Sequence, residues 1–499
     1  MDFFSFDTSW QDSTLYVLLS ASTYFSLLLL TSLRVIIKRR PSGISLAWLF
    51  LIYALPLLGM VSYFIFGELH LGKKRQKRRE QMGDRFHHWL HTESAENRQS
   101  KEGISPCARS MQAFVESYTS IPMLKGNQHT LLSSTDQILL ELTQQIDQAQ
   151  SHCYLLFYIC SEGGLVDNLL DALIKASERG VQCKLLLDSV GSHDFFKSEL
   201  PFIMRRAGIE VGEALPVGAF RLLFQRQDLR MHRKLVCIDD HVAYTGSMNL
   251  VDPAYFKKGH GVGEWIDIMV RCEGPIVQLM QGLFIWDWYL ETSNKMALPL
   301  SQIELPLSKI ARFPIIGAQN SQLIPSGPEF GKASIHQVLL SAIYEAKFSL
   351  VLTTPYFVPD ESILEALQVA ALRGVDVKII LPAKNDSFMV KYASRAFFDE
   401  LLTAGVKIYK FHGGLLHSKT IVIDEKIALL GTVNLDRRSF WLNFEMTMLI
   451  DNDQFAGELL TIQMHYLLES DQFLLADWRK RSYLKKLLES TLYLFSPLL

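Results

Sequence analysis

Two stretches of the sequence share one internal spacing: HRKLVCIDDHVAYTGSMN at 232–249 and HSKTIVIDEKIALLGTVN at 417–434. Each begins with a His-x-Lys pair, reaches an aspartate after four further residues, Asp239 or Asp424, and ends in a Gly-Ser/Thr-x-Asn segment. One such pair is usually an ordinary surface feature. Its repetition with identical spacing argues for two copies of one functional unit.

Each pair is followed by an apolar, strand-like run, LVCID in the first stretch and TIVID in the second. Residues two apart on a strand point to the same side, so His232 and Lys234 project together, as do His417 and Lys419. The pattern predicts that both pairs line one shared cleft.

The sequence around these stretches repeats as well. A helical segment near 138–149 precedes the strand-like CYLLFYI, and a helical segment near 334–346 precedes FSLVLTTPYF in the same order. Alternating helices and strands are typical of an α/β fold, and the repeat predicts two α/β/α sandwich domains with the site at their interface. We place the domains at 111–295 and 326–499, with an inter-domain linker at 296–325.

Two apolar stretches precede the repeats, at 15–37 and 44–66, and each is long enough to cross about 30 Å of hydrocarbon. The chain begins with acidic rather than basic residues, which disfavours a secretory signal. We therefore expect an uncleaved two-helix transmembrane hairpin within residues 1–70, followed by a basic and polar linker over 71–110.

The alternative to a spanning hairpin is a pair of buried or interfacial helices, because Arg34, Pro56 and Gly59 interrupt the apolar stretches. Orientation follows from positive charge, since the basic cluster at 73–79 is larger than the one at 34–40. This bias predicts catalytic domains on the cytoplasmic side. The same cluster also fits a solvated linker or a patch that holds anionic lipid headgroups.

The C-terminal stretch WRKRSYLKKLLESTLYLFSPLL, at 478–499, mixes Lys and Arg with Leu, Tyr and Phe. This mixture is typical of a helix that lies in a membrane interface. A helix that closes the second domain is an equally good interpretation.

Composition limits the possible functions. The formal net charge is -2, so the chain lacks the overall basic field of a protein that coats nucleic acid. The six cysteines have no CxxC spacing, which indicates neither a zinc site nor a disulfide framework. With no carboxylate cluster of magnesium type either, we expect chemistry without a metal or other cofactor.

The paired motifs resemble those of the phospholipase D superfamily, and four longer segments are similar to bacterial cardiolipin synthases: HRKLVCIDDHVAYTGSMNLVDPAYF, GEWIDIMVRCEGP, TPYFVPDESIL and LLHSKTIVIDEKIALLGTVNLDRRSFWLNFE. The resemblance covers roughly 111–499, and the N-terminal hairpin fits it too. It implies two phospholipase D-like domains in a pseudo-twofold arrangement, in a multi-pass enzyme of the bacterial inner membrane.

The chemistry of these groups suits a phosphodiester. One imidazole can attack phosphorus while the other gives a proton to the departing alkoxide. Two lysines and two asparagines can stabilise the charge on the nonbridging oxygens: Lys234, Lys419, Asn249 and Asn434.

Two downstream acids are candidates to orient the histidines: Asp267 in EWIDIMV and Glu445 in NFEMTML. They occupy corresponding places in the two halves, so we expect each to hold its own half's histidine. The alternative is that they only end strands on a polar face. Asp239 and Asp424 complete the motifs as site residues, and their apolar surroundings predict that they anchor the motif rather than touch substrate.

The resemblance also implies a reaction. One histidine would take a phosphatidyl group covalently from one phosphatidylglycerol and release glycerol, and a second phosphatidylglycerol would accept the group to give cardiolipin. Analogy assigns His232 as nucleophile and His417 as general acid, then base. Membrane phospholipids would be its partners, without nucleic acid. A hydrolase or another phosphatidyltransferase is the alternative, ahead of a membrane-anchored nuclease or a noncatalytic lipid-binding protein.

Overall fold

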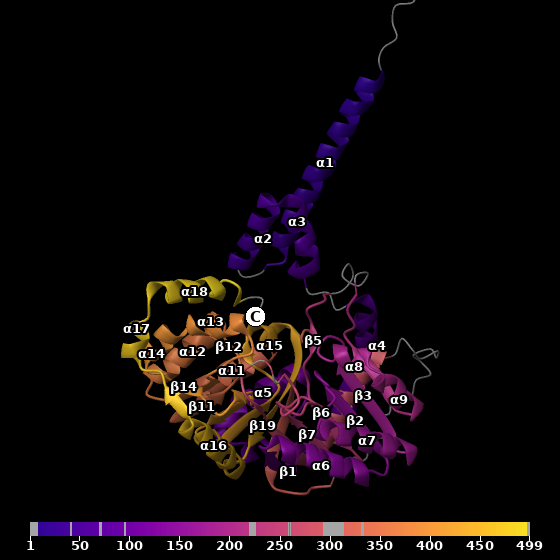
Figure 1. Ribbon diagram of the computed structural model, residues 1–499, viewed down its shortest axis with the longest axis vertical. Helices are drawn as coiled ribbons and strands as arrows, with labels where there is room; N and C mark the ends of the chain where they lie inside the picture. Colours follow the sequence, from indigo (N-terminus) through magenta and orange to yellow (C-terminus); the bar gives the residue numbers. More distant parts are fainter. Residues whose placement is uncertain are drawn as a thin grey trace, which may run out of the picture. The chain divides into compact units, whose positions relative to one another are not determined.

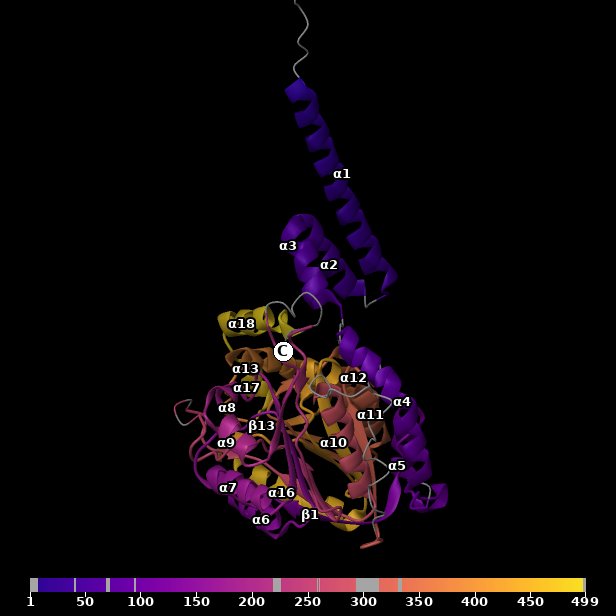
Figure 2. The ribbon, with the colours of Figure 1, turned by 90° about the vertical axis from the view of Figure 1, so that its right-hand side faces the viewer.

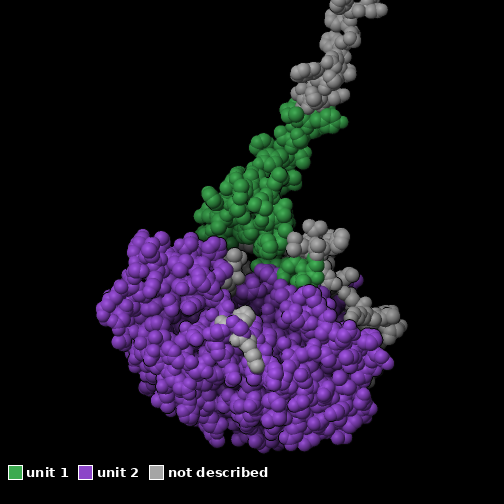
Figure 3. All heavy atoms as spheres, in the orientation of Figure 1, with its two compact units in different colours: residues 1–73, 217–227 green, residues 74–216, 228–499 purple. Residues whose placement is uncertain are grey.

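The computed structural model describes residues 8–39, 42–68, 72–93, 96–218, 226–257, 259, 261–292, 314–330 and 334–496. The chain divides into two compact units (Figure 3). One comprises residues 1–73 and 217–227, and the other comprises residues 74–216 and 228–499. Both repeated halves lie in the second unit, which we call the catalytic unit.

The N-terminal unit contains one long helix and two short ones. α1 (Thr8–Ile37) includes the apolar stretch at 15–37, and it is the one helix among the described residues with the length and composition to cross a membrane. The prediction of a single helix over 44–66 is wrong. Instead α2 (Ser42–Ala54) ends before α3 (Pro56–Ser62), and a π-helical turn, η1 (Tyr63–Gly67), follows.

The break has a local cause. Pro56 has no N–H for a helical hydrogen bond and its ring clashes with the preceding turn. Leu55, immediately before it, leaves the helical region with φ -136° and ψ 73°. The interruption that the sequence suggested therefore ends one helix and starts another.

The first half of the catalytic unit supplies these strands: β1 (Leu124–Leu132), β2 (His152–Phe157), β3 (Gln182–Asp188), β4 (Glu210–Ala214), β5 (Arg230–Met231), β6 (Leu235–Ile238), β7 (Val242–Gly246), β8 (Trp265–Ile266) and β9 (Met269–Glu273). Its helices are α4 (Lys73–Glu93), η2 (Lys101–Gly103), α5 (Pro106–Thr119), α6 (Thr135–Gln148), α7 (Leu165–Glu178), α8 (His193–Lys197), α9 (Leu200–Arg206) and α10 (Ile276–Thr292). α4 and α5 thus occupy much of the stretch predicted as a linker.

The second half supplies another set of strands: β10 (Gln319–Ser326), β11 (Ser349–Thr353), β12 (Phe357–Val358), β13 (Asp376–Pro382), β14 (Lys407–Phe411), β15 (Leu415–Leu416), β16 (Thr420–Ile423), β17 (Ile427–Gly431), β18 (Leu435–Asp436), β19 (Asn443–Asp451) and β20 (Ser470–Gln472). Its helices are α11 (Ser334–Glu345), α12 (Glu361–Leu372), α13 (Phe388–Arg395), α14 (Phe398–Ala404), α15 (Arg437–Trp441), α16 (Asp453–Leu468), α17 (Leu475–Arg479) and α18 (Tyr483–Tyr493).

One continuous sheet runs through both halves. From one edge to the centre its order is β20-β14-β13-β11-β16-β17-β19-β10, and from the other edge it is β4-β3-β2-β6-β7-β9-β1. Apart from the extra edge strand β20, corresponding elements occupy corresponding places. β1 and β10 pair antiparallel at the centre and join the halves. The repeat predicted from the sequence is confirmed, and helices cover both faces of the sheet (Figures 1 and 2).

Each half has its own apolar core. In the first half, α6 and α7 pack against the sheet through fully buried aliphatic residues such as Leu139, Leu169 and Leu185. In the second half, α11 and α12 do the same through residues such as Leu367 and Ile379. Buried residues recur at three- and four-residue intervals along such helices, as Leu139, Leu142 and Ile146 do on α6, which explains why these segments fold as helices on the sheet.

Candidate active site

Each histidine follows a short strand that crosses between the halves. β5 of the first half pairs in parallel with the start of β19 of the second, and the His232 N–H donates to Phe444 O at 2.9 Å. β15 of the second half pairs in parallel with β8 of the first, and the His417 N–H donates to Ile266 O at 2.8 Å. Each histidine is thus fixed one residue away from the acidic residue of the other half.

The acids consequently hold the histidines in a crossed pattern. His232 Nδ1 lies 2.8 Å from Glu445 Oε2, and His417 Nδ1 lies 2.6 Å from Asp267 Oδ1. The sequence prediction paired each acid with its own half's histidine, and that pairing is wrong. Its physical cause is the exchange of β5 and β15, because a strand brings its side chains to its spatial neighbour and not to its neighbour in the sequence.

A hydroxyl from the same half completes the support of each acid. Ser247 Oγ donates to Asp267 Oδ1 at 2.6 Å, and Thr432 Oγ1 donates to Glu445 Oε2 at 2.5 Å. Sequence reasoning quoted both residues in the Gly-Ser/Thr-x-Asn segment but assigned them no role. The repetition of a hydroxyl at the same motif position was the signal that could have found them.

The two lysines lie beside the histidines. Lys234 Nζ donates to His232 O at 2.8 Å, and Lys419 Nζ donates to His417 O at 2.5 Å. Burial lowers the pKa of Lys234 to about 7 and that of Lys419 to about 8, while Glu445 and Asp267 oppose the change. Lys419 also contributes to the lowered pKa of Lys234, as expected when two cations approach one another.

The protonation states follow from burial and neighbouring charge. Burial lowers the pKa of His232 and of His417 to about 4, although the adjacent carboxylates act in the opposite direction. Burial alone would raise the pKa of Asp267 and Glu445, but the facing histidines and hydrogen bonds outweigh it and lower the pKa of both acids. Neutral imidazoles that donate Nδ1–H to ionised acids keep Nε2 as a base or nucleophile.

The two motif asparagines differ in their surroundings. Asn249 Oδ1 accepts the Ile159 N–H at 3.2 Å, which fixes the orientation of its amide. Asn434 Oδ1 is buried and has no hydrogen-bond partner among the described residues. Both asparagines are buried, and they lie three residues after the ends of β7 and β17.

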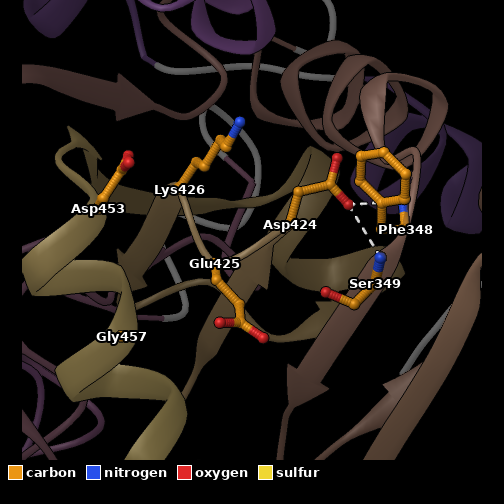
Figure 4. Close-up of a pocket in the computed structure, with 7 residues that line it drawn as sticks. All are labelled: Phe348, Ser349, Asp424, Glu425, Lys426, Asp453 and Gly457. Atoms are coloured by element: carbon orange, nitrogen blue, oxygen red, sulfur yellow. Dashed lines mark hydrogen bonds between the residues drawn. The ribbon is translucent and has the colours of Figure 1, made fainter.

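Asp239 and Asp424 directly follow β6 and β16, the strands that begin one residue after the two lysines. The Asp239 carboxylate accepts backbone N–H groups of three consecutive residues at 2.6–2.9 Å, at 150–152. Asp424 accepts the corresponding N–H groups at 347–349 and lines a surface pocket there (Figure 4). These bonds match the anchoring role and set both aspartates apart from groups that could touch substrate.

Comparison with known proteins gives this geometry a family. The family model described as cardiolipin synthase, PLD-like domain, matches residues 142–288 and 339–465, and one described as phospholipase D-nuclease N-terminal matches residues 27–68. Cardiolipin synthase A of Serratia proteamaculans is 46% identical over 490 residues, which are 98% of this chain and 100% of that protein. Cardiolipin synthase A of Yersinia pseudotuberculosis is 47% identical over 481 residues, 96% of this chain and 98% of that protein. The chain belongs to the cardiolipin synthase family.

The fold of this cardiolipin synthase family member is also found in a solved structure. A phosphatidylserine synthase of Haemophilus influenzae superposes with a TM-score of 0.58, over 78% of this chain and 97% of that one, at 13% sequence identity. At such low identity the likeness concerns the fold alone.

One further residue of the family site was missed by the sequence prediction. Arg233, between His232 and Lys234, is fully buried and its Nη1 bonds both carboxylate oxygens of Asp287 on α10 at 2.5 Å. Its Nε donates to Glu445 O at 3.0 Å. The first motif is therefore held to α10 by a buried ion pair and to β19 by a hydrogen bond. The variable position of a His-x-Lys pair carries no spacing signal that would reveal this contact.

Proposed function

We propose that the chain makes cardiolipin by transferring the phosphatidyl group of one phosphatidylglycerol to a second, with release of glycerol. The observation that carries this proposal is the crossed pair of histidine–acid contacts, His232 with Glu445 and His417 with Asp267, beside two buried lysines. One half of the chain alone would leave each histidine without its acid.

In the first step, His232 Nε2 attacks phosphorus and the bond from phosphorus to the glycerol oxygen breaks. His417 gives a proton to that oxygen, and glycerol leaves. His417 needs to be charged for this role, and the phosphodiester anion favours its imidazolium form by adding a negative charge beside it. The assignment of His232 as nucleophile follows the family resemblance.

In the second step, a hydroxyl of another phosphatidylglycerol takes the place of glycerol. His417, now neutral, accepts the hydroxyl proton, the oxygen bonds to phosphorus, and the bond from phosphorus to His232 breaks. Lys234 and Lys419 stabilise the nonbridging oxygens in both steps, where buried cations act more strongly than they would in water. Asp267 and Glu445 keep the imidazoles oriented throughout.

Membrane attachment brings this site to its substrates. α1, together with the pair formed by α2 and α3, is the membrane-embedded anchor of the chain in the bacterial inner membrane. The basic cluster at 73–79 favours a cytoplasmic catalytic unit, because positive residues are retained on that side. The buried histidines favour a lipid hydroxyl over water as acceptor.

The test is product analysis by mass spectrometry on the purified full chain in detergent micelles with labelled phosphatidylglycerol. His232→Ala and His417→Ala are compared with His465→Ala, an exposed histidine on α16 that serves as the matched control. We expect cardiolipin and glycerol from the wild type and the control only. Phosphatidic acid as the sole product would make the chain a hydrolase, and full activity in either active-site variant would contradict the shared site.

A further inference from the structure

The short helices of the N-terminal unit fold back on one another. A Cβ at Gly59 would lie 2.5 Å from Leu51 O and 2.7 Å from Ile52 Cα, so α3 touches the backbone of α2. The rings of Trp48 and Tyr63 meet edge to face at 5.4 Å between centroids. Both contacts join positions at equal distances before and after the break at Pro56, as in an antiparallel pair (Figures 1 and 2).

The residues that precede and follow this helix pair lie close together. Arg34, in the last turn of α1, binds Glu68 through Nε–Oε1 at 2.5 Å and Nη2–Oε2 at 2.8 Å. Lys38 Nζ also lies 3.9 Å from Glu68 Oε2. A continuous helix over 44–66 would carry Glu68 roughly 30 Å away from Arg34. Entry into α2 and exit from η1 are therefore adjacent.

Neither arm is long enough to cross a bilayer. α2 has 13 residues, and at about 1.5 Å per residue it is ~20 Å long, against about 30 Å of hydrocarbon. The bend carries exposed apolar side chains, with Leu57 71% and Leu58 60% exposed, as expected for a tip that lies in lipid. α1, with 30 residues, is about 45 Å long and can cross.

We propose that α1 crosses the membrane once and that α2 and α3 form a re-entrant pair, which places the residues before α1 on the side opposite the catalytic unit. Only residues 69–71 lie between Glu68 and Gly72, and so short a segment extends at most ~14 Å. The catalytic unit therefore starts on the side where the pair leaves the membrane. This inference does not depend on the reaction.

Charge supports this topology independently. A single crossing by α1 puts the basic residues at 34–40 and at 73–79 on the same side of the membrane, whereas two crossings would put them on opposite sides. The residues before α1 carry Asp2 and Asp7 and no Lys or Arg. All of the positive charge near the membrane then lies on the cytoplasmic side, as the positive-inside rule requires.

The test uses the full chain with epitope tags ahead of α1 and at the C-terminal end, in right-side-out spheroplasts and in inverted vesicles. Protease should remove the first tag only in spheroplasts, and the second tag only in inverted vesicles. Lys38→Cys should react with an impermeant maleimide from the side of the second tag. Both tags on one side, with Lys38→Cys on the other, would overturn the proposal in favour of two crossings.

A disulfide measures the fold of the pair itself. Trp48→Cys with Tyr63→Cys should form an intramolecular disulfide on mild oxidation, whereas one continuous helix would hold the two cysteines ~22 Å apart. Gly59→Leu should reduce the yield several-fold by separating the helices. Gly43→Leu is the matched control, because nothing lies within 4 Å of a Cβ there, and its yield should be unchanged. No disulfide in the parent double variant would contradict the re-entrant pair.

α18 exposes its apolar side chains and buries an acidic one, whereas an ordinary surface helix does the opposite. Tyr483 and Leu484 are 78% and 75% exposed, and Leu487 is exposed beside them. Leu494, directly after the helix, is 72% exposed. Glu489 instead is buried against the rest of the catalytic unit, where it binds Arg481 and Arg395 on α13. The apolar stripe therefore points to solvent and the acidic group points inward.

We infer that α18 lies in the headgroup region of an anionic bilayer, with its leucines toward the acyl chains. Basic residues border the stripe, with Lys485 and Lys486 exposed on the helix and Arg479 and Lys480 just before it. Such a border fits anionic headgroups at about 1 kcal/mol for each basic residue near the surface. Of the two sequence interpretations, this favours the interfacial helix.

Brominated lipids test this contact in the full chain, reconstituted in phosphatidylglycerol-containing vesicles. A fluorescent label on Leu487→Cys should shift to the blue and lose most of its emission to brominated acyl chains. The same label on Gln144→Cys, an exposed position on α6, should not. Unquenched emission from the label at position 487 would overturn the inference.

Discussion

The two motif-bearing halves of the catalytic unit have matching chemistry but unequal supports. In both, a histidine meets an acid from the other half and a lysine bonds the histidine's own carbonyl oxygen. Between histidine and lysine, however, the first half has Arg233 in a buried ion pair with Asp287, whereas the second has Ser418, whose Oγ lies 3.4 Å from Thr353 Oγ1. The reacting groups are duplicated, while the scaffold around them has diverged.

The largest difference should appear between the histidines themselves. His232→Ala removes the nucleophile proposed above, so we expect kcat to fall by at least ~10⁴-fold with no labelled covalent adduct. His417→Ala should also lower kcat, but it keeps the nucleophile and should still form an adduct slowly in single-turnover experiments with labelled phosphatidylglycerol. An adduct in His232→Ala and none in His417→Ala would reverse the two roles.

Stability should separate the halves next. Arg233→Met leaves Asp287 buried without its partner, which typically costs about 3–5 kcal/mol. Ser418→Ala breaks one weak contact and should cost under ~1 kcal/mol. Thermal unfolding in detergent should therefore show a large loss of Tm for the first variant only. Arg233→Met with Asp287→Leu should recover much of the loss, and failure to recover would mean that the ion pair is not the cause.

The hydroxyls behind the acids should give matched, smaller effects. Ser247→Ala and Thr432→Val each remove a hydrogen bond to an ionised carboxylate, worth about 1.5–3 kcal/mol. We expect kcat to fall by roughly 10- to 100-fold in each, with little change in KM, because the acids orient the histidines and do not bind substrate. A change confined to KM in either variant would argue against this role.

The pH profile should distinguish the lysines by the smallest effect. Burial lowers the pKa of Lys234 to about 7 and that of Lys419 to about 8, and a lysine is charged only below its pKa. The kcat/KM of the free enzyme should therefore decline as pH rises above about 7. Lys234→Arg keeps its charge and should move this decline upward, by about one pH unit, more than Lys419→Arg does. An unshifted decline in both variants would assign it to other groups.

The spacing of the repeated motifs predicted the duplicated α/β architecture and marked both histidine–lysine pairs, because the same positions recur in each half. The expectation that each pair lies on a strand is wrong, since residues 232–234 separate β5 from β6 and residues 417–419 separate β15 from β16. The sequence also predicted the anchoring of Asp239 and Asp424, since a carboxylate at an apolar strand end needs nearby backbone donors. The hydroxyls of Ser247 and Thr432 were within its reach but were assigned no role.

Contacts between distant segments were beyond such reasoning. β5 pairs with β19 although Arg230 and Asn443 are far apart in the sequence, and neither strand's composition specifies its partner. The same holds for Arg233 and Asp287, which meet only because α10 packs beneath the first motif.

The sequence by itself determined the candidate reacting groups, the repeat and the apolar N-terminal segment, because these depend on local composition and periodicity. Tertiary structure decided which acid serves which histidine, because strand exchange between the halves sets the neighbours of each ring. It also decided that the apolar segment at 44–66 bends back at Pro56, since close packing at Gly59 and the ion pair between Arg34 and Glu68 join residues that spacing alone keeps apart.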